Sequence, residues 1–154
     1  TWYTRASESA SVSVAAIVPA DRGRIGSAIH VSYKATSFRY SLVGVGLPGP
    51  RSLRALDSVS FWVRGSGKVT MAFDHLGENT NVKAWKGWMI DSSWKRISFT
   101  PADLDPGAAD SLGGNIGWNG VRDSITNLTF LLVDGSDIWL DDIRLYGIDR
   151  DDVR

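Results

Sequence analysis

The stretch that decides the fold is residues 58–73, which read Ser-Val-Ser-Phe-Trp-Val-Arg-Gly-Ser-Gly-Lys-Val-Thr-Met-Ala-Phe. Apolar side chains occupy every second position on both sides of a Gly-Ser-Gly tripeptide, which is the period of a strand with one buried face. We expect six side chains to face inward: Val59, Phe61, Val63, Val69, Met71 and Phe73. The tripeptide Gly65-Ser66-Gly67 is typical of a tight turn, so we predict a β-hairpin of two short strands here.

The same alternation recurs along the chain. It predicts strands near residues 11–14, 28–33, 40–46, 128–133 and 138–146, and two more strands that meet near 91–93. The longest connection, residues 101–115, holds at most one helical turn at 102–104. About ten short strands at this turn spacing, with alternating rather than continuous apolar runs, favour antiparallel sheets. We therefore predict an all-β fold, an antiparallel β-sandwich of the jelly-roll type.

Composition limits the function. The chain has 154 residues, which favours a single domain over 1–154, with 1–10 and 148–154 peripheral. Its 17 basic residues balance its 17 acidic residues, so it lacks the electrostatic signature of nucleic-acid or membrane binding. The absence of cysteine excludes disulfides, thiolate nucleophiles and Cys-ligated zinc. The sequence has neither an initiator Met nor a signal-peptide pattern, so we expect a piece of a longer polypeptide.

Motifs for chemistry are weak. Residues 44–49 match G-x-G-x-x-G, but Pro48 and Pro50 prevent the helix that a dinucleotide site requires. The two histidines, His30 and His75, lie far apart and outside any metal-binding or nucleophile motif. Paired-carboxylate glycosidase chemistry stays open, because two carboxylates can converge from anywhere in a sequence. We assign no catalytic residue and no catalytic cofactor.

The seven tryptophans are the most unusual feature, and six of them divide by their neighbours. Three lie in strongly apolar strands, and we expect them in the core: Trp62, Trp94 and Trp139. Three others have lysine, asparagine or glycine neighbours: Trp85, Trp88 and Trp118. An exposed indole in such a setting can stack on the C–H face of a sugar. The alternative is that each ring covers an edge of the core.

Trp85 and Trp88 are three positions apart, so a regular strand would point them to opposite faces. Both can serve one site only if Gly87 marks a bulge; otherwise one of them belongs to the core. Nearby polar side chains that could bond sugar hydroxyls are Tyr40, Asp74, His75, Asn81 and Lys83.

The pair Asp141-Asp142 interrupts an apolar strand. Alternation places one of the two carboxylates with the inward-facing set, and a buried carboxylate needs a partner. A bound Ca2+ with backbone carbonyls around it would provide one. Hydrogen bonds from backbone amides are the alternative.

Several segments resemble one family in their order and spacing. They are 61–65 (Phe-Trp-Val-Arg-Gly), 94–99 (Trp-Lys-Arg-Ile-Ser-Phe) with Pro101, 132–135, and 138–147 (Ile-Trp-Leu-Asp-Asp-Ile-Arg-Leu-Tyr-Gly). They are similar to the β-sandwich (jelly-roll) carbohydrate-binding modules of bacterial plant-cell-wall-degrading enzymes, closest to the β-glucan- and cellulose-binding type. Residues 26–33 are similar to the second strand of these modules, and the resemblance covers most of 11–147.

The resemblance implies a non-catalytic module that binds a β-linked glucan: cellulose, mixed-linkage glucan or xyloglucan. It implies a plant cell-wall polysaccharide as partner, a tethered hydrolase in the same polypeptide, and secretion from a bacterium. It also implies that Trp85 and Trp88 supply aromatic platforms and that Asp142 ligates a structural calcium. Two alternatives stay open, namely a polysaccharide lyase or glycosidase on the same fold, and a protein-interaction or adhesion sandwich.

Overall fold

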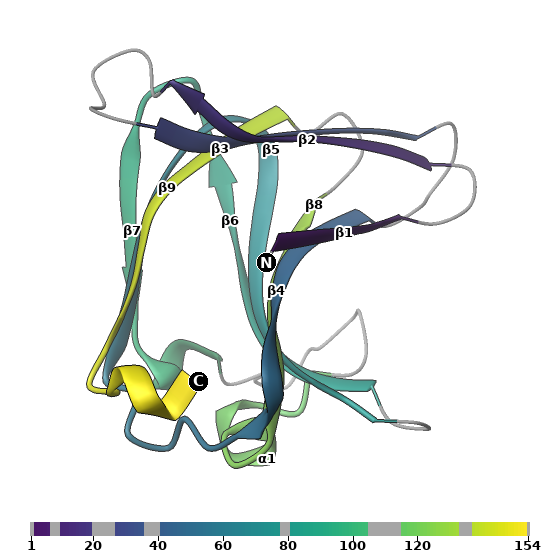
Figure 1. Ribbon diagram of the computed structural model, residues 1–154. Helices are drawn as coiled ribbons and strands as arrows, with labels where there is room; N and C mark the ends of the chain where they lie inside the picture. Colours follow the sequence, from purple (N-terminus) through teal and green to yellow (C-terminus); the bar gives the residue numbers. More distant parts are fainter. Residues whose placement is uncertain are drawn as a thin grey trace.

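A computed structural model of the chain describes residues 2–6, 10–19, 27–35, 41–77, 81–104, 115–132 and 137–153, and these carry nine β-strands in two facing antiparallel sheets (Figure 1). Sheet A contains, in order, β1 (Trp2–Ala6), β4 (Ser41–Arg51), β8 (Ile125–Leu132), the second half of β5 (Ser58–Leu76) and β6 (Asn81–Ile90). Sheet B contains β2 (Ala10–Pro19), β3 (Ser27–Ala35), β9 (Asp137–Tyr146), the first half of β5 and β7 (Lys95–Phe99). The prediction of an all-β antiparallel jelly-roll sandwich is confirmed.

Strand β5 belongs to both sheets. Its residues 58–66 pair with β9 in sheet B, and its residues 67–76 pair with β6 in sheet A. The predicted hairpin at 65–67 is therefore wrong, because the chain bends there and continues in the same strand. Gly65 and Gly67 have φ angles of 137° and 96°, which side chains rarely allow, and a Cβ at Gly65 would lie 1.9 Å from the Asp137 carbonyl oxygen. The two glycines thus form a corner at which one strand passes between packed sheets.

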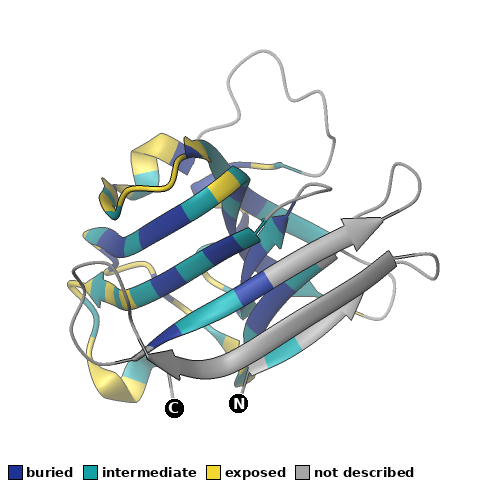
Figure 2. Cartoon of the chain, turned by 90° about the horizontal axis from the view of Figure 1, so that it is seen from above, coloured by how far each residue is buried: buried dark blue, intermediate teal, exposed yellow. Residues whose placement is uncertain are grey.

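The hydrophobic core lies between the sheets, and the alternation along β5 decides which side chains enter it. All six side chains predicted to face inward from this strand are buried. The ring of Phe130 from β8 meets the ring of Phe61 edge-on, with 5.3 Å between centroids. Figure 2 shows the buried positions gathered between the two layers. The even-numbered residues of β5 consequently point to the outer faces of the sheets.

Short helical turns connect the strands. A 3-10 turn, Pro101–Leu104, covers the predicted turn at 102–104, and one α-helical turn, Trp118–Val121, follows it along the chain. A second 3-10 turn, Arg150–Val153, ends the described part of the chain. None of the helices in the described ranges has the length and apolar character needed to cross a membrane.

Candidate functional site

One row of paired residues crosses the outer face of sheet A. From β1 to β6, backbone pairing aligns Tyr3, Gly44, Thr129, Ala72 and Trp85. Small residues occupy the middle of this outer row, and aromatic residues occupy its two ends. A Cβ at Gly44 would lie 2.8 Å from Thr129 Cγ2 and 3.0 Å from Tyr3 Oη, so the hydroxyl end of Tyr3 lies over the glycine. In Figure 1, β1 at one edge of sheet A and the lower ends of β5 and β6 at the other edge extend to the side that faces away from sheet B, so sheet A curves around its outer face.

Polar side chains support the outer row from the neighbouring positions. Asn127 donates a hydrogen bond from Nδ2 to Tyr3 Oη over 2.9 Å, and the Thr129 hydroxyl donates to Asp74 Oδ2 over 2.8 Å. Asp74 is only 4% exposed, and its Oδ1 has no hydrogen-bond partner among the described residues. Burial raises the pKa of Asp74, while the Thr129 hydrogen bond and the nearby charge of Lys83 act in the opposite direction. The outer face therefore contains a buried acceptor oxygen, Asp74 Oδ1, to which no described residue donates a hydrogen bond.

The backbone ladder separates Trp85 from Trp88. Pairing between β5 and β6 runs without a register shift from Asn81 to Ile90, so there is no bulge at Gly87. Trp88 faces inward, with its ring 5.7 Å from Phe61 and 5.1 Å from Phe99. The prediction of Trp88 as a sugar platform is therefore corrected, since its ring packs in the core. Trp85 lies opposite Ala72 on the outer face and is half-buried.

Trp118 also belongs to the core. It is 8% exposed and meets Phe73 edge-on at 5.2 Å, which corrects the expectation of an exposed ring. The preceding residues explain this placement. Asn115 forms a parallel bridge with Lys83, and the Ile116 amide donates to the Lys83 carbonyl over 2.9 Å. The segment is thereby fixed along the edge of β6, and the helical turn that follows places the indole over the core.

The other predicted polar residues divide as follows. Asp74 and Lys83 pair with each other across β5 and β6, on the outer face. His75 lies on the opposite side of β5 from Asp74, and its Nδ1 lies 2.7 Å from the Ser124 carbonyl oxygen, so the structure does not bring it to the outer row. Asn81 pairs with Leu76 at the end of the ladder. Tyr40 and the Asn81 side chain lie outside the described residues.

The outer face of sheet B carries large side chains instead of small ones. Pairing aligns His30 with Trp139 and Trp139 with Arg64. The rings of His30 and Trp139 are stacked, 4.0 Å apart and 8° from parallel, and the Arg64 guanidinium carbon lies 3.9 Å from the Trp139 ring centre. His30 and Arg64 come from the strands on either side of β9, so both faces of the Trp139 indole are covered. This ring is therefore not available for stacking on a sugar.

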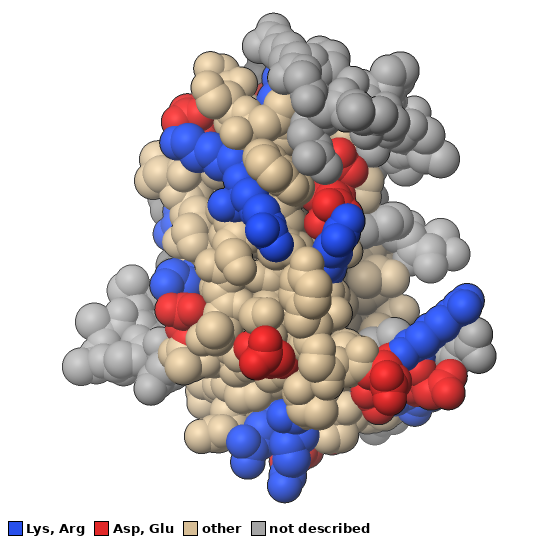
Figure 3. Space-filling view, turned by 90° about the vertical axis from the view of Figure 1, so that its left-hand side faces the viewer, with Lys and Arg blue, Asp and Glu red and all other residues tan. Residues whose placement is uncertain are grey.

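The expectation that Trp62, Trp94 and Trp139 lie in the core is wrong. Trp62 and Trp139 have the opposite strand parity to their buried neighbours, such as Phe61 and Ile138, and both are half-buried. The Trp94 ring centre lies 5.5 Å from the Arg64 guanidinium carbon, on the same outer face. Figure 3 views the molecule from this side and shows basic and acidic side chains interspersed over it.

A bulge explains why Asp142 is not buried. Trp62 pairs with Asp141 and Ser60 pairs with Arg144, so β9 contains one extra residue between them. Asp142 lies in the bulge with a φ angle of 49°. Its side chain is exposed and accepts a hydrogen bond from Arg144 Nε over 2.7 Å. The predicted inward-facing aspartate is thus corrected.

The surroundings of Asp142 differ from a calcium shell. Across the described residues, no three His, Asp or Glu side chains gather closely enough to hold a metal ion. The structural calcium stays a prediction, and its other ligands would have to be backbone carbonyls or residues outside the described ranges. A calcium-dependent rise in melting temperature that is lost in Asp142→Asn would test it.

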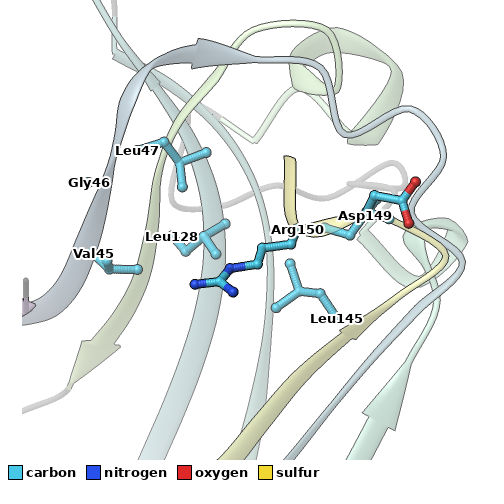
Figure 4. A pocket seen from close by; sticks show the side chains of 8 residues that line it. Val45, Gly46, Leu47, Leu128, Leu145, Asp149 and Arg150 are labelled. Carbon is cyan, nitrogen blue, oxygen red and sulfur yellow. The ribbon is translucent and has the colours of Figure 1, made fainter. Parts of the chain in front are cut away.

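A separate pocket of about 460 Å³ opens at one end of the sandwich (Figure 4). It is lined by Val45, Gly46, Leu47, Leu128, Leu145, Ile148, Asp149 and Arg150. Leu128 faces the interior from β8, on the opposite side of the strand from Thr129, and the Arg150 side chain extends beside Leu128 and Leu145 (Figure 4). The pocket shares no residue with the outer row, and its apolar walls are the margin of the core.

Sequence reasoning missed several residues of the outer face, namely Tyr3, Lys68, Met89, Asn127 and Thr129. Apolar alternation gives no sign of a strand at 2–6, so Tyr3 could not be placed beside the glycine that it covers. Alternation along β8 could have placed Asn127 and Thr129 outward, because Leu128, Phe130 and Leu132 are the apolar set. Only the register between strands brings these residues into line with Trp85.

Comparison with known proteins gives the fold. No family pattern and no curated protein matches the chain. It is similar to the family 11 carbohydrate-binding module of the cellulosomal cellulase Lic26A-Cel5E of Clostridium thermocellum, with 23% identity, a TM-score of 0.71, and coverage of 96% of this chain and 88% of that one. A structure of a Clostridium thermocellum family 11 module in complex with a β-1,3-1,4-mixed-linked tetrasaccharide matches at 24% identity and a TM-score of 0.70, over 95% and 88% of the chains.

A third structure, the family 30 module of cellulosomal cellulase Cel9D-Cel44B of the same organism, matches at 10% identity and a TM-score of 0.61, over 97% and 92% of the chains. At these identities the likeness concerns the arrangement of the strands, and the resemblance noted in the sequence is confirmed at that level. The chain has the fold of the β-sandwich carbohydrate-binding modules.

Proposed function

We propose that the chain is a carbohydrate-binding module that binds a β-linked glucan on the outer face of sheet A. The observation that carries this proposal is the outer row, with Tyr3 and Trp85 at its ends and Gly44, Thr129 and Ala72 between them. Small residues leave the middle of a curved face low, and the half-buried Trp85 at its border provides an indole on which a sugar ring can stack. The mixed-linkage tetrasaccharide complex of a family 11 module with the same fold supports a β-glucan as the ligand class.

The polar groups of this face would fix the orientation of the sugar. Lys83 donates hydrogen bonds and Asn127 can both donate and accept, while Asp74 is buried beneath them. Few aromatic contacts of about 1 kcal/mol each give affinities nearer micromolar than nanomolar. We further propose that the module is secreted by a bacterium as part of a glycoside hydrolase. In that setting the module raises the effective concentration of the tethered enzyme on cellulose, mixed-linkage glucan or xyloglucan.

Affinity electrophoresis in gels that contain a soluble β-glucan tests the proposal. We expect retardation of the wild-type chain by mixed-linkage glucan or xyloglucan, and a clearly weaker retardation of Trp85→Ala. Failure of every β-glucan to retard the chain would favour a protein-interaction sandwich. Release of reducing ends or unsaturated products by the chain alone would instead favour a glycosidase or a lyase.

A further inference from the structure

The border of the outer face formed by β6 carries a cation beside Trp85. Gly87 follows Trp85 by two positions, so both residues point to the outer side of the strand. A Cβ at Gly87 would lie 2.4 Å from Lys68 Cε and 3.2 Å from Lys68 Nζ. The stem of Lys68, which comes from β5, therefore lies across Gly87, and this position must lack a side chain for the ammonium to reach the border.

The ammonium of Lys68 is placed between two ligand-accessible side chains. Along β6, Trp85 lies on one side of Gly87 and Met89 on the other, each about 7 Å away along the strand. Met89 is 75% exposed, which makes it the most exposed large apolar side chain among the described residues. Lys68 forms no hydrogen bond or ion pair with another described residue. Its charge is therefore available to a ligand that stacks on Trp85.

Among the described side chains of this face the charge balance is positive, although the whole chain has a formal net charge of zero. In the regular ladder of sheet A, at positions 42–46, 68–76, 83–89 and 127–131, three outward-facing described side chains carry charge: Lys68, Lys83 and Asp74. Asp74 is buried, and burial raises its pKa, so its negative charge is the least favoured of the three. A neutral glucan can accept hydrogen bonds from these ammonium groups, but it leaves the surplus of positive charge without a countercharge.

We propose that Lys68 forms a subsite for a carboxylate, and that the module prefers a β-glucan in which the sugar beside the Trp85-bound ring is a uronic acid. This inference rests on the proposed function, because it assigns the substrate class of the same face. The ammonium donates charge-assisted hydrogen bonds to the carboxylate of the ligand. The indole of Trp85 and the thioether of Met89 limit the position of that sugar from both sides.

The test compares two tetrasaccharides that differ by one group. One is cellotetraose, and the other is cellotetraose with one glucose unit oxidised at C6 to glucuronate. We expect the wild-type chain to bind the acidic sugar about fivefold more tightly at low salt, which is the scale of a partly exposed ion pair. The preference should disappear at about 0.5 M NaCl, where charges at a surface are screened.

Two variants separate the ammonium from the rest of the face. Lys68→Met keeps the stem and removes the charge, so it should bind both sugars equally. Gly87→Ala keeps the charge and displaces the ammonium, because the added methyl group occupies the place of Lys68 Cε. It should lower the preference as well. The matched control is Lys95→Met on β7 of sheet B, which changes the net charge equally. It should retain the preference, since Lys95 lies on the other sheet and pairs with Asp91 in the connection before β7.

The outcomes are distinct. Equal binding of both sugars by the wild-type chain, or an unchanged preference in Lys68→Met with a wild-type melting temperature, would overturn the subsite. Binding of the neutral sugar alone would also overturn it, while the proposed function would stand. If neither sugar binds, the proposed function and the subsite fail together.

Discussion

Trp85 and Trp88 lie three residues apart on one strand, and their replacement by alanine should have opposite consequences. Trp88 packs on Phe61 and Phe99 inside the sandwich. Removing a fully buried tryptophan costs about 3–5 kcal/mol, and Trp88 is half-buried, so we expect a loss of about 2–3 kcal/mol in Trp88→Ala. For a chain of this size, that loss lowers the melting temperature by about 5–10 °C.

Trp85→Ala should mainly affect binding. Trp85 faces outward opposite Ala72. Among the described residues, no aromatic ring of the core packs against its indole. We expect a stability loss of no more than about 1 kcal/mol. The affinity for a β-glucan tetrasaccharide should fall about fivefold to tenfold, which corresponds to the loss of one stacking contact.

Thermal unfolding and titration calorimetry on the same preparations measure both effects. The control is Trp139→Ala, which removes an outward-facing tryptophan from sheet B and should leave the affinity unchanged. The reverse pattern would contradict these expectations: Trp88→Ala would lose affinity at an unchanged melting temperature, and Trp85→Ala would melt early. That result would mean that the assignment of the two faces of β6 is incorrect.

Three further variants test the corner in β5, the buried carboxylate of Asp74 and the stack on Trp139. Gly65→Ala should cost at least about 3 kcal/mol in urea denaturation, because its Cβ would overlap the Asp137 carbonyl oxygen and its φ angle is unfavourable; a loss below about 1 kcal/mol would contradict the corner in β5. Burial raises the pKa of Asp74 in the folded state, so its contribution to stability is complete below the unfolded-state pKa and is lost as pH rises through the folded-state pKa. Asp74→Asn should therefore be at least as stable as wild type at neutral pH, and its stability should fall less with rising pH. A marked destabilisation of Asp74→Asn at neutral pH would show that the charged form of Asp74 is not disfavoured by burial. Trp139→Ala should cost about 2 kcal/mol through loss of its stack with His30 and Arg64, and unchanged stability would show that the stack contributes little.

Local alternation predicts the sheets but not their corners. The six inward-facing residues of β5 could be identified from the sequence, because a period of two survives in both halves of the strand. The sequence does not distinguish a hairpin from a sheet corner at the Gly-Ser-Gly tripeptide, since glycine with positive φ occurs equally well in both. The distinction depends on Asp137, whose carbonyl lies against Gly65 and is remote in sequence.

The tryptophans also show that local sequence patterns predict only part of the structure. The polarity of the neighbouring residues predicts the wrong environment for Trp88 and Trp94, whereas parity relative to buried residues decides where Trp62 and Trp139 point. At Asp142 parity itself fails, because one extra residue in β9 shifts every later side chain to the other face. The candidate site cannot be predicted from local patterns at all. Its residues Tyr3, Thr129 and Trp85 are aligned by pairing between strands from distant parts of the chain.

We expect a β-glucan to bind on the outer face of sheet A. The most direct measurement is a titration of the labelled protein with a mixed-linkage β-glucan tetrasaccharide, followed by NMR of the seven indole N–H signals. We expect the Trp85 signal to shift, together with the backbone signals of Lys68, Lys83 and Met89, while the signals of Trp62, Trp94 and Trp139 on the opposite side of the molecule stay unchanged. Shifts confined to the sheet B tryptophans, or no shift at any indole, would contradict it.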